Sequence, residues 1–181
     1  MFRFITGSFA LLYLNHGTVV THLLPMLSER GVALDVAVLT IALLGPAQVA
    51  GRVVMLVLER WLSMSLVTII AAAFMTAAAA CLSLVTYHPP LLFAFAVLQG
   101  AGVGVASIAR PLVTSNLLGR TAYGAIAGVI AVPVLLAMSI APSTGAVLWS
   151  FGGYALVFGL NLWFALLATV LLTAAVGFGR R

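Results

Sequence analysis

Long apolar runs fill most of this sequence, and short polar breaks separate them. The breaks read SERGVALD, ERW, TYHPP, SNLLGRT and SFGG. A helix that crosses a bilayer needs about 20 mostly apolar residues, and six segments between the breaks have that length. These segments are residues 4–24, 36–58, 62–85, 90–114, 122–149 and 154–176. Because such short connections make neighbouring helices antiparallel, the pattern predicts one all-α bundle of six transmembrane helices over residues 1–181.

The first segment has the basic residue and the apolar run of a signal peptide. No small-x-small cleavage site follows it, and apolar sequence continues through Leu24. We therefore expect it to be retained as the first span.

Composition points to the same class of protein. Hydrophobic residues make up 64% of the 181 residues and charged residues 6%, and the mean hydropathy is +1.27. A water-soluble domain of this length could not cover so much apolar sequence with polar surface. The composition therefore predicts a polytopic membrane protein. The single cysteine, Cys81, lies in an apolar run, which excludes disulfides and cysteine metal sites within the chain.

The few charged residues are unevenly distributed. All eight basic residues are arginines, and the acidic residues are Glu29, Asp35 and Glu59. With a cytoplasmic N-terminus, only Arg30 falls outside and Arg110 lies nearest the inner side, where six others fall: Arg3, Arg52, Arg60, Arg120, Arg180 and Arg181. This positive-inside distribution predicts that both termini are cytoplasmic. No basic patch with interleaved aromatic residues is present, so nucleic acid is not an expected partner.

Polar residues share one face of the first predicted helix. Ser8, Asn15 and His22 recur every seven residues, and Thr18 lies between the last two. Because lipid disfavours such a stripe, it should face other helices or a water-filled cavity. Hydrogen bonding between helices and a solute pathway both remain open. Since imidazole titrates near neutral pH, His22 is a candidate proton carrier.

The fourth predicted helix combines an amide, an arginine and a glycine-rich stretch. Gln99 and Arg110 are eleven residues apart, which is three turns, so they share a face. The glycines Gly100, Gly102 and Gly104 would let another backbone approach closely. At about 1.5 Å per residue, Arg110 lies near the inner edge of a hydrocarbon layer about 30 Å thick. It is therefore either a solute contact in an inner vestibule or an anchor at the helix end.

Four stretches together resemble a known transporter family. They are HLLPMLSERGVALDVAVLTIALLGPAQVAGRVVMLVLERW, LQGAGVGVASIARPL, LLGRTAYGAIAG and PVLLAMSIAPSTGAVL. They resemble the C-terminal six-helix half of a major facilitator superfamily transporter, of the bacterial type that includes small-carboxylate and drug porters. The six segments would then correspond to helices seven to twelve of a full transporter. The resemblance implies secondary active transport across a bacterial inner membrane.

The resemblance also implies roles for particular residues. GPAQVAGRVVMLVLER resembles the family's cytoplasmic hairpin motif, with Gly51, Arg52, Glu59 and Arg60 as its matching members. The APSTG run, which contains Pro142 and Gly145, resembles the Pro/Gly-rich motif of helix eleven. Helices seven and ten of the family line the substrate cavity, and the corresponding candidates are Ser8, Asn15, Thr18, His22, Gln99 and Arg110.

Three functional interpretations follow from the sequence. In the first, the chain is half of a transporter for a small organic solute, such as an anion or a drug. It would pair with a second copy or with a separate N-terminal six-helix half. In the second, it is a non-transporting fragment or a membrane scaffold. The third is an intramembrane enzyme or a channel, for which we find no Gly-x-Ser-x-Gly stretch, metal-ligand spacing or TVGYG-like filter. We expect no catalytic residues, no metal and no cofactor.

Overall fold

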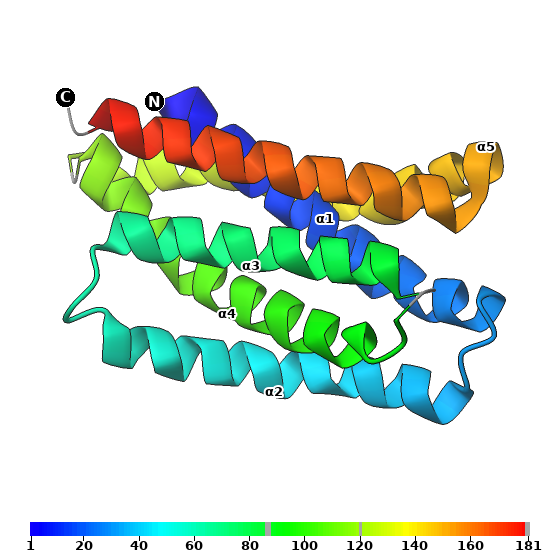
Figure 1. The fold of residues 1–181 in the computed structure, drawn as a ribbon. Helices are drawn as coiled ribbons and strands as arrows, with labels where there is room; N and C mark the ends of the chain where they lie inside the picture. Colours follow the sequence, from blue (N-terminus) through cyan, green and yellow to red (C-terminus); the bar gives the residue numbers. More distant parts are fainter. Residues whose placement is uncertain (86–87, 120, 180–181) are drawn as a thin grey trace.

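The computed structural model describes residues 1–85, 88–119 and 121–179 of the chain. Within these ranges it contains five helical elements, which are α1 (Phe2–Glu29), α2 (Leu34–Leu58), α3 (Met64–Leu84), α4 (Leu91–Leu118) and α5 (Tyr123–Gly179) (Figure 1). The predicted all-α fold class is confirmed. Four of the described helices, α2, α3, α4 and α5, are long and apolar enough to cross a membrane. The fold is therefore compatible with an integral membrane protein.

Helix α1 is not one of these four, although the sequence pattern predicts a span at residues 4–24. The difference arises from side-chain polarity, because α1 contains Asn15, His16, Thr18 and His22 within two turns. All of these except His22 are buried within the bundle. The count of six spans is thus not established by helix length and hydropathy, and it remains a prediction.

The fifth and sixth predicted segments both lie in α5, whose helix is interrupted at two glycines. Gly152 (φ −157°, ψ 22°) and Gly153 (φ 61°, ψ −167°) have non-helical backbone angles. A positive φ at Gly153 is readily adopted only by glycine. The chain turns back there, so that a first arm (residues 123–151) and a second arm (residues 154–179) run in opposite directions (Figure 1). Both glycines lie in the predicted SFGG break.

The helices are arranged around α1 and α4. α1 packs mainly against both arms of α5, whereas α4 packs against α2 and α3, and α3 also contacts α5. At the end that carries the N-terminus, the Phe4 and Phe178 rings stack with centroids 5.7 Å apart. We call this the terminal end, and it also carries the connections from α2 to α3 and from α4 to α5. The opposite, distal end carries the α1–α2 connection and the turn at Gly152 and Gly153 (Figure 1).

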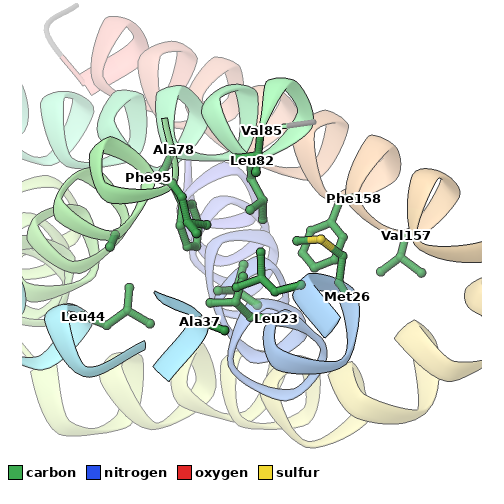
Figure 2. Packing of buried hydrophobic residues seen from close by; sticks show 14 residues of the cluster. Leu23, Met26, Ala37, Leu44, Ala78, Leu82, Val85, Phe95, Val157 and Phe158 are labelled. Carbon is green, nitrogen blue, oxygen red and sulfur yellow. The ribbon is translucent and has the colours of Figure 1, made fainter. Parts of the chain in front are cut away.

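Two apolar clusters fill the interior, one towards each end. The distal cluster joins all five elements through Leu23, Leu44, Leu82, Phe95 and Phe158, together with other buried side chains that converge from different helices (Figure 2). The second cluster lies towards the terminal end and includes Ile5, Phe9, Met75, Val113 and Leu172. Large apolar side chains outside the clusters are exposed along α2 and both arms of α5. This outer surface suits contact with lipid.

Helices α2 and α4 approach each other through glycines. A Cβ on Gly104 would lie 2.9 Å from the Gln48 carbonyl carbon, and one on Gly100 would lie 2.7 Å from the Leu44 carbonyl oxygen. From the other side, a Cβ on Gly51 would lie 2.8 Å from the Ala101 Cα. The structure thus gives the expected role to the glycines of α4, since close backbone approach strengthens packing where lipid supplies no hydrophobic drive.

We predict that Gly104→Ala destabilises the bundle by about 1–3 kcal/mol, because the added methyl group must push α2 away. Gly128→Ala is the matched control, since Gly128 is exposed on the first arm of α5 and a Cβ there meets no described atom within 4 Å. Thermal unfolding in detergent should show a lower Tm for the first variant only. Equal Tm values for the two variants would contradict this account of the α2–α4 contact.

Candidate functional site

Three amide side chains from three helices meet in the middle of the bundle. Gln99 Nε2 of α4 donates to Asn15 Oδ1 of α1 over 3.1 Å. Asn15 Nδ2 donates to the main-chain oxygen of Asn161 on α5 over 3.2 Å, and Asn161 Nδ2 lies 3.5 Å from the main-chain oxygen of Asn15. All three side chains are buried. We call them the amide cluster, and they tie α1 to α4 and to the second arm of α5.

The amide cluster lies where the two apolar clusters meet. Along α1, Asn15 falls between Leu12 of the second cluster and Val19 of the distal cluster. Gln99 falls likewise between Phe95 and Val103 on α4. The amides therefore occupy the centre of an otherwise apolar interior.

Two acceptors of the amide cluster are unused. Gln99 Oε1 and Asn161 Oδ1 are shielded from solvent and have no hydrogen-bond partner among the residues that the structure describes. Buried acceptors in native proteins usually have a partner, which can be an ordered water. An ordered water would satisfy either oxygen.

His22 joins α1 to the first arm of α5. Its Nε2 lies 2.9 Å from the main-chain oxygen of Pro142. A side chain larger than hydrogen at position 145 would overlap the His22 ring, so Gly145 makes room for the imidazole. The APSTG stretch thus contacts the His22 side chain through Pro142 and Gly145. The Tyr154 ring, at 6.1 Å between centroids, borders the same site.

Arg110 borders a small polar cavity near the terminal end. The cavity measures about 110 Å³, and its polar lining consists of Arg110, Ser107, Thr114 and Tyr123, from α4 and the first arm of α5. The guanidinium carbon also lies 5.4 Å from the centre of the Tyr13 ring on α1. This space can hold several waters or a small carboxylate, and an arginine there would attract an anionic group.

The remaining two cavity candidates, Ser8 and Thr18, form hydrogen bonds within α1. Ser8 Oγ donates to the main-chain oxygen of Ile5 and Thr18 Oγ1 to that of Leu14. The structure thus brings Asn15 and Gln99 together, places His22 and Arg110 at separate sites, and leaves Ser8 and Thr18 bonded to their own helix.

The hairpin-motif residues lie along α2 and its connection to α3. Gly51 is buried against α4, whereas Arg52 is half-buried, with an Nε that has no partner among the described residues. Glu59 and Arg60 are exposed, and the Arg60 guanidinium carbon lies 3.8 Å from the centre of the Trp61 ring. Arg120, Arg180 and Arg181, which enter the positive-inside prediction, lie outside the described residues.

Sequence reasoning missed several buried polar residues, of which Asn161 and His16 are the most informative. Asn161 belongs to the amide cluster, and its signal was available as a lone amide within the apolar run FGLNLWF. His16 is more deeply buried than His22, and its Nδ1 has no partner in the part of the chain that the structure describes. It falls outside the seven-residue stripe, and only the packing of α1 between other helices reveals its burial.

Comparison with known proteins does not assign the chain to a family. No model of a known protein family matches it, and no curated protein sequence matches it either. Among the described residues, no group of three or more His, Cys, Asp or Glu side chains is arranged to hold a metal ion.

We predict that Asn15→Leu lowers the free energy of unfolding by about 1–2 kcal/mol, because it removes the amide that bonds to both Gln99 and Asn161. The double variant Asn15→Leu with Gln99→Leu should recover part of the loss, since it removes the stranded partner as well. Asn116→Leu, at an exposed position of α4, is the control. Purely additive losses in unfolding experiments in detergent would show that the two amides are not coupled.

Proposed function

We propose that the chain is one six-helix half of a secondary transporter resembling the major facilitator superfamily. It moves a small organic anion together with a second six-helix half. The observation that carries this proposal is the polar cavity beside Arg110, because a guanidinium in an apolar bundle suits recognition of an anion. In the proposed correspondence, the cavity lies between helices ten and eleven.

In this proposal the six crossings are α1 to α4 and the two arms of α5. The reversal at Gly152 and Gly153 supports two crossings within α5, because the arms are antiparallel and each exceeds 20 residues. Arg3 and Arg60 belong to the terminal end and Arg30 to the distal end. By the positive-inside rule, this distribution favours a cytoplasmic terminal end in a bacterial inner membrane.

Transport requires two conformations that expose the solute to alternate sides of the membrane. The second half supplies the opposite wall of the pathway, and Arg110 attracts the solute from the cytoplasmic vestibule. His22 is the candidate proton carrier of this half. Because Glu29, Asp35 and Glu59 all lie at or near helix ends, any membrane-embedded carboxylate for proton coupling comes from the other half.

A non-transporting membrane scaffold is the alternative, and one observation favours it. Ser8 and Thr18 bond to their own helix, and Asn15 and Gln99 bond to neighbouring helices in the buried interior. These contacts match the hydrogen bonding that stabilises packed membrane helices. In that case the polar stripe of α1 serves stability and not a pathway.

We predict that Arg110→Ala abolishes uptake of an organic anion into proteoliposomes that contain both halves, because the cavity loses its cation. The folded state should persist, as judged by an unchanged Tm. Arg3→Ala, at an exposed arginine of the same end, is the control and should transport normally. Unchanged uptake by Arg110→Ala would exclude the arginine from anion recognition.

A separate prediction concerns the partner half. If a second copy supplies it, native mass spectrometry of the chain in mild detergent should show a dimer that persists on dilution to micromolar concentration. A spectrum with monomer alone would rule against self-pairing and would leave a distinct six-helix half as the partner.

A further inference from the structure

A long apolar groove opens between α2 and α3, on the outside of the bundle. Its volume is about 280 Å³, and every side chain that lines it is apolar. The small residues Gly51, Ala71 and Ala101 belong to its lining, and the exposed side chains of Val54 and Phe74 border it. Neither the amide cluster nor the cavity beside Arg110 shares a residue with it.

The groove exists because α2 and α3 both pack on α4 and make almost no contact with each other over their described lengths. Figure 1 shows α4 between them. The connection of residues 59–63 bridges the two helices at the terminal end, where Leu58 and Leu62 line the groove. The groove is thus lined by three helices and reaches the connection at the terminal end.

The apolar lining of the groove indicates what kind of molecule can bind there. Water is disfavoured, because a water in this groove would find no polar side chain to bond. A whole helix, about 10–12 Å across with its side chains, cannot enter a hollow of this volume. A flexible hydrocarbon chain suits the apolar lining.

A charged group lies beside the same end of the groove. Arg60 falls between the lining residues Leu58 and Leu62 in the chain, and its guanidinium stacks on the exposed Trp61 ring. Tryptophan prefers the level of lipid headgroups, and arginine forms strong hydrogen bonds with phosphate. The adjacent Glu59 leaves the connection without net charge, so attraction to phosphate depends on the position of Arg60 and not on a general positive field.

We infer that this groove binds a membrane phospholipid, with one acyl chain between α2 and α3 and the phosphate on Arg60. The site requires a phospholipid but no transport activity, so its test is independent of the proposed transport function.

The test is lipid titration of the full chain in detergent, followed by native mass spectrometry. The probes are dioleoylphosphatidylglycerol and dioleoylglycerol, which has the same chains without the phosphate. We expect Arg60→Ala to weaken binding of the phospholipid about fivefold and to leave binding of dioleoylglycerol unchanged. Arg3→Ala, at an exposed arginine of the same end, should not weaken binding of either lipid. Equal phospholipid binding by the two arginine variants would overturn the assignment of the phosphate.

A second pair of variants tests the acyl chain. Ala50→Phe fills the groove from an exposed position of α2, and Val54→Trp provides a second filling variant. We expect both to reduce binding of both lipids at least tenfold, whereas Val53→Phe, on the exposed surface outside the groove, should bind as the parent does. Parent-like binding by the two filling variants would overturn the assignment of the groove.

Discussion

The contact between Asn15, Gln99 and Asn161 governs the rest of this fold. Amides in an apolar interior lose stability unless they are hydrogen-bonded, and the three hydrogen bonds made by these side chains all join different helices. Making these three bonds requires a particular rotation of α1 and α4 and a particular position of the second arm of α5 along its axis. The two apolar clusters then pack on either side of this level.

Close backbone contact complements this polar contact. Where lipid surrounds a bundle, burial of apolar side chains contributes little to association, so dispersion contacts between fitted surfaces matter more. Gly100 and Gly104 bring α4 against α2, and Gly145 admits His22 from α1. Helix α4 packs against α2 on one side and against α3 on another. Because α4 lies between them, α2 and α3 stay apart and leave the groove.

The polar side chains thus lie at different depths in the molecule. The amide cluster occupies the middle, and Arg110 borders a small cavity near the terminal end. Arg60 lies outside, beside an apolar groove. Two arginines near the same end therefore have different surroundings, one facing hydroxyl groups inside the bundle and the other an aromatic ring on its surface. These surroundings suit a small anion in the first case and a lipid phosphate in the second.

Hydropathy and composition were sufficient to predict an apolar, all-helical chain and the break around Gly152 and Gly153, because both depend on local residue type. The spacing of Asn15 and His22 correctly placed them on one face of α1, but it could not tell that Asn15 meets Gln99 whereas His22 meets Pro142. The burial of His16 was missed for the same reason, whereas Asn161 carried a local signal as a lone amide in an apolar run. Helical periodicity defines which residues share a face, whereas the partner of that face depends on the crossing and rotation of helices distant in the chain, which packing alone decides.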